Sequence, residues 1–288
     1  MLRIPKVEYL TPKTLEEACS LLALHQDSAK VIAGGTDLLI QLKRRLIKAP
    51  HYIIGLKIIS DLNSIKYDEK DGLKIGALAT LSSIGESAVV RKKYPVLTEA
   101  VSQFGATEVR NMGTVGGNLC NAAPSADTAP PLLALEAKVK LVSSGGSRTI
   151  PLEEFFTAPN ESVLDAGEIM AEIQIPRQAP FTAGAFIKLT RTAMGLAVVN
   201  IAVVITTENH TIKEIKIALG ACAPTPWRAK KAENIIRGRK ITDDLIQQAS
   251  RAASEESRPR SMPEYKKDII EVFTKRALKK ALARADGA

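Results

Sequence analysis

Two loops with paired glycines, far apart in the sequence, are the residues of this chain best suited to bind a charged ligand. The first has the sequence Ile32-Ala33-Gly34-Gly35-Thr36-Asp37, and the second Gly113-Thr114-Val115-Gly116-Gly117-Asn118. Paired glycines lack a Cβ and can adopt positive φ, so neighbouring backbone N–H groups can turn toward one oxyanion. Each loop can therefore cradle a phosphate, and the two together suit a diphosphate.

The residues around the first loop predict the elements that position it. The run Ala29-Lys30-Val31-Ile32-Ala33 is typical of a short buried strand, and Leu38 to Leu42 opens an apolar helical stretch. A strand, a glycine turn and a helix N-terminus in this order direct the helix dipole toward a bound anion. We expect Asp37 to cap this helix. The ligand is therefore expected to be anionic.

Neither loop matches the common nucleotide-binding motifs. No Gly-x-Gly-x-x-Gly follows a strand, and no Gly-Lys-Ser or Gly-Lys-Thr closes either loop, which argues against a Rossmann fingerprint and a P-loop. A glycine pair can also be an ordinary turn, so one loop alone decides nothing. We interpret Gly145-Gly146, which lies between two strand-like runs, as such a hairpin turn.

Composition limits the class of protein. The chain has 288 residues, 45% hydrophobic and 25% charged, which fits a soluble globular protein long enough for two domains. No apolar run reaches the roughly 18 residues that span a bilayer, and the N-terminus lacks a signal-like segment. We expect a cytoplasmic protein with no membrane span. The isolated Cys19, Cys120 and Cys222 predict no disulfide framework, zinc site or iron–sulfur cluster within this chain.

The net charge of +9 would permit binding to nucleic acid. Acidic residues alternate with the basic clusters, however, and aromatic residues make up only 4% of the chain. Without aromatic interleaving or a recognisable reading helix, we expect no nucleic-acid partner. Solvated helix faces or an acidic partner protein explain the charge more simply.

The order of predicted elements indicates two domains. Alternating residues around Lys70-Asp71-Gly72 predict a hairpin, and Arg177-Gln178-Ala179-Pro180 is interpreted as a linker. We therefore divide the chain into domains 1–176 and 177–288. In the second domain, strands are expected at 185–189, 198–205 and 212–219, and helices fill the rest.

The glycine loops belong to longer motifs that resemble one known family. They extend to Ala33-Gly34-Gly35-Thr36-Asp37-Leu38-Leu39 and to Asn111-Met112-Gly113 through Asn118, and Pro124-Ser125-Ala126-Asp127 follows. With the C-terminal run from Leu219 to Ala229, these motifs resemble the FAD-binding medium subunit of molybdenum hydroxylases of the carbon monoxide dehydrogenase and xanthine dehydrogenase type. The resemblance implies an α+β fold: a two-subdomain FAD-binding domain of the vanillyl-alcohol-oxidase (PCMH) type, then a smaller domain with a three-stranded antiparallel sheet and a helical bundle.

The resemblance also implies which residues bind FAD, with its pyrophosphate between the two loops. Backbone contacts are implied for Val31, Ile32, Ala33, Gly34, Gly35, Thr36, Asp37 and Leu38, and closure over the pyrophosphate for Thr114, Val115, Gly116, Gly117 and Asn118. Asp127 matches a contact to ribityl or ribose hydroxyls, Phe104 a flanking apolar contact, and Ile169 and Lys188 positions near the flavin ring. From the residues alone, Lys188 is either an edge residue that reaches solvent or a cation beside the flavin. No catalytic or metal-binding residue is expected.

One position departs from the resemblance. Gly195 stands in the run Arg191-Thr192-Ala193-Met194-Gly195, where the family often has an acidic residue. A polar contact from this loop to the flavin or its acceptor is therefore not expected.

The implied function is electron transfer. Such a subunit takes electrons from the clusters of a small 2Fe-2S subunit and passes them from FAD to NAD or a quinone-type acceptor. A large molybdopterin subunit hydroxylates the substrate, and a dimer of heterotrimers is expected. Two alternatives stay open: a self-contained FAD-dependent oxidoreductase on the same fold, and a basic adaptor protein whose glycine turns serve folding only.

Overall fold

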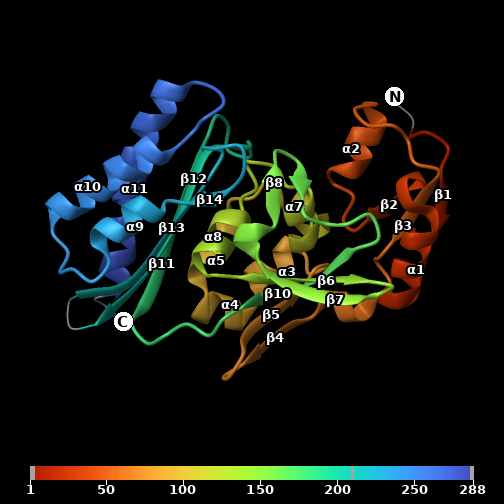
Figure 1. The fold of residues 1–288 in the computed structure, drawn as a ribbon, viewed down its shortest axis with the longest axis horizontal. Helices are drawn as coiled ribbons and strands as arrows, with labels where there is room; N and C mark the ends of the chain where they lie inside the picture. Colours follow the sequence, from red (N-terminus) through yellow and green to blue (C-terminus); the bar gives the residue numbers. More distant parts are fainter. Residues whose placement is uncertain (1–3, 209–210, 286–288) are drawn as a thin grey trace.

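A small parallel sheet begins the fold. The computed structural model describes residues 4–208 and 211–285. The first sheet has the order β1-β3-β2, formed by Glu8–Leu10, Tyr52–Gly55 and Ala29–Ile32. Helix α1 (Leu15–His25) packs on it at the right of Figure 1. The buried Ala18 and Cys19 precede the buried Leu22 by four and three residues, so these side chains share the helix face that covers the sheet.

The second sheet is antiparallel and contains two hairpins. Its order is β4-β5-β10-β6-β7, formed by Ile65–Asp68, Gly72–Gly76, Ile169–Ile175, Lys138–Ser143 and Gly146–Pro151. The predicted turns at Lys70-Asp71-Gly72 and Gly145-Gly146 are both confirmed, because β4 pairs with β5 and β6 with β7 across them. Strand β10 joins the two hairpins into one sheet. A short ribbon, β8 (Phe156–Ala158) with β9 (Glu161–Ser162), follows β7 in the chain.

Short helices fill the space between this sheet and the C-terminal part of the chain, as Figure 1 shows. They are α3 (Leu81–Glu86), α4 (Ala88–Lys93), α5 (Pro95–Ser102), α6 (Thr107–Met112), α7 (Val115–Cys120) and α8 (Ala129–Ala134). Helix α7 runs through the second glycine pair, where the sequence predicted a loop. The turns at 26–28, 60–63 and 152–154 are 3₁₀ helices.

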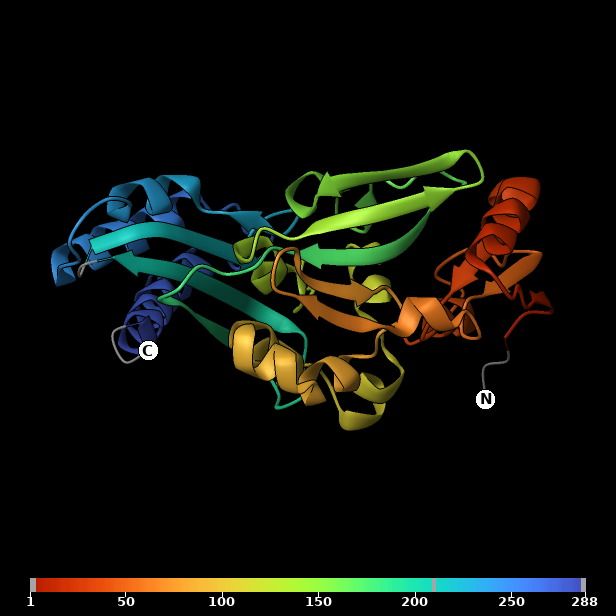
Figure 2. The same ribbon diagram turned by 90° about the horizontal axis from the view of Figure 1, so that it is seen from below.

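A long antiparallel sheet carries the C-terminal part. It has the order β11-β12-β13-β14, formed by Thr182–Thr190, Ala197–Glu208, Thr211–Gly220 and Trp227–Arg228. Helices α9 (Lys230–Ile236), α10 (Asp243–Glu256) and α11 (Pro263–Ala285) cover one of its faces, as Figure 2 shows. The predicted α+β class is confirmed, and the short β14 is a strand that the sequence did not predict. Strand β10 ends at Ile175 and the next sheet begins at Thr182; the boundary at 176/177 stays a prediction.

Both faces of this sheet are buried. Along β12, Val199, Ile201 and Val203 pack against the helices. The alternating Ala202 and Val204 join the core around α5 and α8. This alternation follows from the two-residue period of a strand. The C-terminal sheet is therefore a shared wall between its own helices and the N-terminal part.

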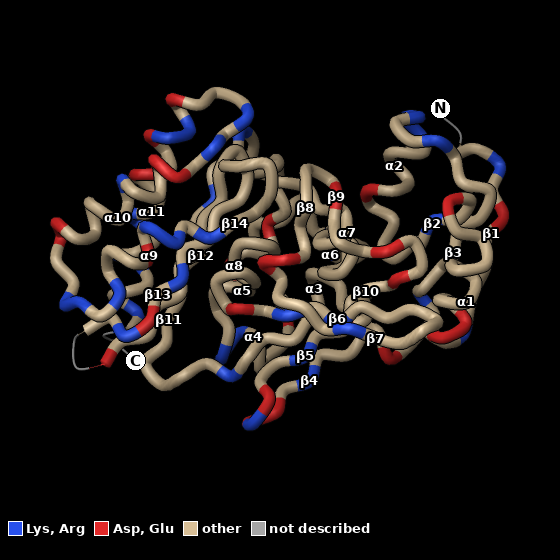
Figure 3. Tube along the Cα trace, viewed as in Figure 1, with Lys and Arg blue, Asp and Glu red and all other residues tan. Residues whose placement is uncertain are grey.

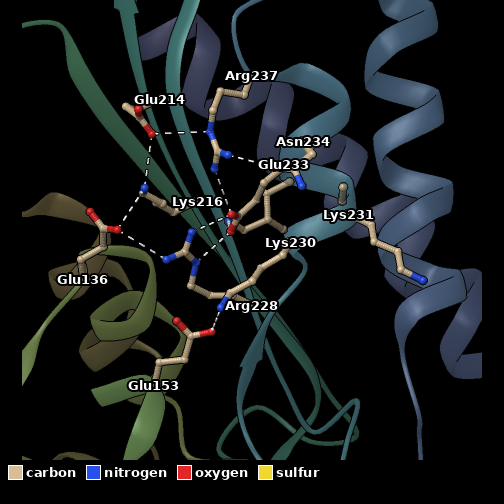
Figure 4. Close-up of polar contacts among 12 residues, drawn as sticks. Glu136, Glu153, Glu214, Lys216, Arg228, Lys230, Lys231, Glu233, Asn234 and Arg237 are labelled. Atoms are coloured by element: carbon tan, nitrogen blue, oxygen red, sulfur yellow. Dashed lines mark hydrogen bonds and ion pairs between the residues drawn. The ribbon is translucent and has the colours of Figure 1, made fainter. Parts of the chain in front are cut away.

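Ion pairs connect the two parts of the chain, as Figure 4 shows. Arg228 on β14 donates to Glu233 at 2.6 Å and lies 3.5 Å from Glu136, which follows α8. The side chain of Glu233 is only 1% exposed and also accepts the backbone N–H of Ile217 at 2.9 Å. The buried Arg228–Glu233 pair therefore braces the C-terminal part itself, while Arg228 and Lys216 reach the half-exposed Glu136 of the other part at 3.5 and 3.0 Å.

A second ionic junction centres on Glu99 in α5. Its carboxylate accepts the backbone N–H of Phe186 at 2.9 Å, pairs with Lys280 at 3.1 Å and also pairs with Arg284. Burial acts to raise the pKa of Glu99, but the hydrogen bonds from Arg284, Phe186 and Lys280 prevail and lower it below the ordinary value of 4.5. The ionised form of Glu99 therefore stabilises the folded chain.

Replacing Glu99 by glutamine should lower the free energy of unfolding by about 1–3 kcal/mol at neutral pH, since charge-assisted hydrogen bonds are lost. A depressed pKa contributes stability above the unfolded value of 4.5 that disappears as pH falls through the lower folded value. Denaturant titrations of wild type and Glu99→Gln over a pH series should therefore converge in acid. A difference that stays constant with pH would contradict this assignment.

Basic and acidic residues are interspersed over both parts of the chain, as Figure 3 shows. Neither part of the chain is therefore purely basic, despite the net charge of +9. Among the described helices, none is both long and apolar enough to cross a membrane.

Candidate cofactor site

The two glycine loops, about eighty residues apart in sequence, are in direct contact. A Cβ added to Gly34 would lie 1.9 Å from the carbonyl oxygen of Met112, the residue before the second loop. Only a glycine permits this approach. A cavity of about 280 Å³ lies between the loops, so the sequence prediction that they converge on one site is correct.

Most of the predicted residues line this cavity. They are Val31, Ile32, Ala33, Gly34, Gly35, Thr36, Asp37, Leu38, Phe104, Thr114, Gly116, Gly117, Asn118 and Ile169. Val115 does not line it, because its side chain is fully buried in the core around α7. Asp127 and Lys188 also lie outside the lining. What each of these residues contacts in a cofactor stays a prediction.

The first loop presents free backbone donors to the cavity. Within the described residues, none of the N–H groups of residues 34–37 donates a hydrogen bond to the chain. Gly35 has φ +71°, a conformation that side-chain-bearing residues rarely adopt. The helix that follows, α2 (Leu38–Lys43), is six residues long, so its dipole is small. The free amides, rather than the helix, are therefore the main electrostatic attraction for an anion.

The second loop is built differently from the prediction. The N–H groups of Val115 and Gly116 donate to the carbonyls of Ala79 and Ala77, at 3.1 and 2.9 Å. That of Gly117 donates to the Thr114 hydroxyl at 3.0 Å, as in an N-capped helix. These amides anchor α7 and cannot also bind phosphate. The expectation that amides of both loops face the ligand is thus wrong for residues 115–117.

The glycines of the second loop serve close packing instead. A Cβ on Gly116 would lie 2.6 Å from the Cβ of Ala77 and 2.7 Å from its carbonyl oxygen. The first turn of α7 can therefore press directly on the residues after β5. This segment can therefore offer a ligand side-chain donors, the Thr114 hydroxyl and the Asn118 side-chain NH₂ group. The side-chain oxygen of Asn118 is already used, because it accepts a hydrogen bond from the Thr128 hydroxyl at 2.6 Å.

Asp37 does not cap α2, contrary to the prediction. Its side chain makes no capping hydrogen bond, and its backbone is helical, with φ −95° and ψ −53°. A capping residue needs an extended backbone to turn its side chain back to the first helical N–H groups. Asp37 instead lies at the edge of the cavity.

Asp127 and Lys188 form a buried ion pair, with Oδ2 and Nζ 2.5 Å apart and side chains 6% and 2% exposed. Lys188 therefore does not reach solvent, and that alternative is wrong. Burial raises the pKa of Asp127, opposed by Lys188 and by a hydrogen bond from Asn200. Lys188 also donates to the carbonyl of Gln103 at 3.0 Å. Gln103 precedes Phe104, so the pair lies directly behind the cavity wall.

Several lining residues were missed by the sequence reasoning. Gln41 donates weakly to Asn121 across the cavity, at 3.5 Å. A glutamine inside the apolar run Leu38-Leu39-Ile40-Gln41-Leu42 was the available signal. Cys120 and Glu168 also line the cavity but carried no local signal, because neither belongs to a motif. Gly195 is not among the lining residues and lies in the β11–β12 turn.

The cavity suits a flavin dinucleotide. Free amides at residues 34–37 can meet a pyrophosphate, and Leu56, Leu78, Leu81, Leu164 and Met170 supply apolar surface for rings. No lysine or arginine lines the cavity among the described residues, so main-chain donors must carry the anion. No group of three metal-binding side chains is found in the described part of the chain.

Comparison with known proteins agrees with this site. Residues 5–178 match the family described as FAD binding domain in molybdopterin dehydrogenase, and residues 184–281 the CO dehydrogenase flavoprotein C-terminal domain. The chain therefore belongs to the FAD-binding subunits of the molybdopterin dehydrogenases.

Individual relatives match over almost their whole length. The chain is 32% identical to the xanthine dehydrogenase FAD-binding subunit of Escherichia coli O157:H7, covering 97% of both chains. It is 32% identical to the glyceraldehyde dehydrogenase medium chain of Sulfolobus acidocaldarius, covering 96% of this chain and 98% of the relative. A solved chain of carbon monoxide dehydrogenase from Hydrogenophaga pseudoflava matches with a TM-score of 0.95 and 34% identity, over 98% and 99% of the two chains.

Proposed function

We propose that this chain is the electron-transferring FAD subunit of a molybdenum-containing hydroxylase. It works with a large molybdopterin subunit and a small 2Fe-2S subunit, as a dimer of heterotrimers. FAD bound here would supply the redox chemistry by which electrons from the iron–sulfur clusters reach NAD or a quinone-type acceptor. The observation that carries the proposal is the convergence of the two glycine loops on one cavity with free amides at residues 34–37.

The chain's own residues bind and position the cofactor. The amides of residues 34–37 would hold the pyrophosphate, and the Thr114 hydroxyl and the Asn118 amide, which line the same cavity, would add side-chain hydrogen bonds. The carboxylate of Asp37, which lines the cavity, belongs beside hydroxyls rather than phosphate, because like charges repel. Phe104 and Ile169 exclude water from the ring. Lys188, which Asp127 neutralises behind the wall, would hold the backbone before Phe104 in place through the carbonyl of Gln103.

Two ionisable side chains of the cavity, those of Cys120 and Glu168, favour a subunit over a self-contained oxidoreductase. Burial raises the pKa of the Cys120 thiol to about 12, so the thiol is protonated at neutral pH and is no nucleophile. A hydrogen bond from Arg148, at 2.7 Å, lowers the pKa of Glu168, which keeps this carboxylate ionised. Neither the protonated thiol nor this weakly basic carboxylate is suited to remove a proton from a substrate.

The relatives support the same division of labour. At nearly equal identity, their names refer to xanthine, glyceraldehyde and carbon monoxide. A chain that itself contacted substrate would need a different pocket for each of these molecules. The substrate is therefore bound by the molybdopterin subunit, and this chain carries the shared electron-transfer step.

Reduction of the isolated chain tests the proposal. The purified chain loaded with FAD should bind one flavin, which dithionite reduces and which xanthine, an aldehyde or carbon monoxide does not. Adding the two partner subunits should make reduction by the native substrate fast. Rapid bleaching of the isolated chain by a substrate would instead establish the self-contained oxidoreductase.

A further inference from the structure

A buried polar cluster crosses from the C-terminal sheet to the cavity wall. Asn200 on β12 donates its side-chain N–H to Asp127 Oδ1 at 2.8 Å, and Lys188 on β11 donates to Asp127 Oδ2. Asn200 is completely buried. It lies opposite Lys188 in the β11–β12 register and opposite Gly220 in the β12–β13 register. Two strands therefore donate to this one carboxylate, and a third, β13, lies beside Asn200.

Asn200 is a polar side chain at a buried position surrounded by apolar residues, where it lowers the stability of the fold. Its neighbours Val199 and Ile201 are apolar, and the other residues on its own face of β12, Ala202 and Val204, pack in the core. Its side-chain oxygen is buried without a hydrogen-bond partner, which costs stability. Gly220 leaves space for it, because a Cβ there would lie 2.2 Å from that oxygen. An apolar residue would pack better at this position. The contribution of Asn200 is therefore its hydrogen bond to Asp127.

The cluster is connected to two residues that line the cavity. Lys188 donates to the carbonyl of Gln103, and the next residue, Phe104, lines the cavity. On the other side, Thr128 follows Asp127 and donates its hydroxyl to Asn118, which also lines the cavity. The segment before Asp127 is held as well, because the N–H of Ala221 donates to the carbonyl of Pro124 at 2.6 Å. The orientation of Asp127 thus determines both wall positions.

We propose that Asn200 is a positioning residue of the cofactor site, through which the C-terminal sheet sets the geometry of the cavity wall. Its amide fixes one oxygen of Asp127, which leaves the other to hold Lys188. The inference rests on the proposed function only in taking this cavity as the FAD site. Loss of the amide lets the carboxylate rotate, so that the Lys188 charge and the Phe104 and Asn118 side chains lose their fixed positions.

The variant Asn200→Leu tests this role, because leucine has nearly the same size but no donor. The dissociation constant for FAD should rise about tenfold, the effect of losing one charge-assisted hydrogen bond. The midpoint potential of the bound flavin should shift as well. Val204→Ala is the matched control: it lies on the same face of the same strand, and it should lower the melting temperature without changing the dissociation constant or the potential.

A second variant covers the case in which the leucine protein does not fold. Asn200→Asp keeps the shape and places a second carboxylate beside Asp127, with Lys188 as the cation bonded to the cluster. Two carboxylates this close cannot both ionise. In acid the shared proton restores a donor, so FAD affinity should approach that of wild type, and it should fall as the pH rises. Wild type should show no such loss over the same range.

The outcomes separate this inference from the proposed function. Wild-type affinity and potential in Asn200→Leu, or an Asn200→Asp affinity with the pH profile of wild type, would overturn the positioning role. A wild-type chain that binds no FAD would instead overturn the proposed function. Weakened binding in proportion to lost stability, matched by Val204→Ala, would reduce Asn200 to a structural residue.

Discussion

Replacing Gly34 by alanine is expected to abolish tight FAD binding. The added Cβ would lie 1.9 Å from the Met112 carbonyl oxygen, and a backbone atom cannot move aside as a flexible side chain can. The loops must separate, and overpacking of this kind costs about 1–3 kcal/mol. Because the separated loops can no longer close on one ligand, we expect the dissociation constant to rise about a hundredfold. Fluorescence titration of the cofactor-free chain with FAD measures this directly.

Gly145→Ala is the control for this substitution. Gly145 lies in the β6–β7 turn, and a Cβ there meets only the Ser143 hydroxyl at an ordinary 3.8 Å. It makes the same chemical change at a distance from the cavity, so FAD binding should stay at the wild-type level. Equal affinities of Gly34→Ala and wild type would mean that the loops do not hold the cofactor.

Lys188→Met should cause the largest loss of stability. The Asp127 side chain is only 6% exposed, so without Lys188 it keeps one hydrogen bond, from Asn200, and no opposite charge. Removing one partner of a buried pair costs about 3–5 kcal/mol. The free energy of unfolding from denaturant titration should fall by about that amount.

The double variant Lys188→Met with Asp127→Asn shows whether the loss comes from the unpaired charge. Removing both charges leaves nothing uncompensated, so the double variant should be more stable than Lys188→Met alone. If the loss in the double variant equals the sum of the losses measured for Lys188→Met and Asp127→Asn alone, the two residues do not act as a pair. In that case the wall behind Phe104 is held by other contacts.

Local sequence signals predicted the elements that depend on local chemistry. The strand at Ala29–Ile32, the helix after Asp37 and both hairpin turns follow from short patterns of apolar residues and glycines. The convergence of the two glycine loops was also correct: the glycine pairs suggested a shared diphosphate site, and the resemblance of the longer motifs to a family strengthened it. Nothing within either loop alone brings Gly34 against Met112.

Features that depend on partners distant in the chain could not be predicted from the sequence. Gly116 and Gly117 have the same composition as Gly34 and Gly35, but the carbonyls of Ala77 and Ala79 and the Thr114 hydroxyl occupy the amides of residues 115–117. Similarly, nothing near Lys188 indicates that Asp127, 61 residues earlier, neutralises it. Asp37 has the type of a capping residue, but its helical backbone prevents the cap.

A crystal structure of the chain grown with FAD tests the central claim most directly. We predict that the pyrophosphate lies against the amides of residues 34–37, with the Thr114 and Asn118 side chains on its other side and the flavin ring toward Phe104 and Ile169. Those amides left without the cofactor, with FAD bound at another place or absent despite saturating concentration, would contradict the account.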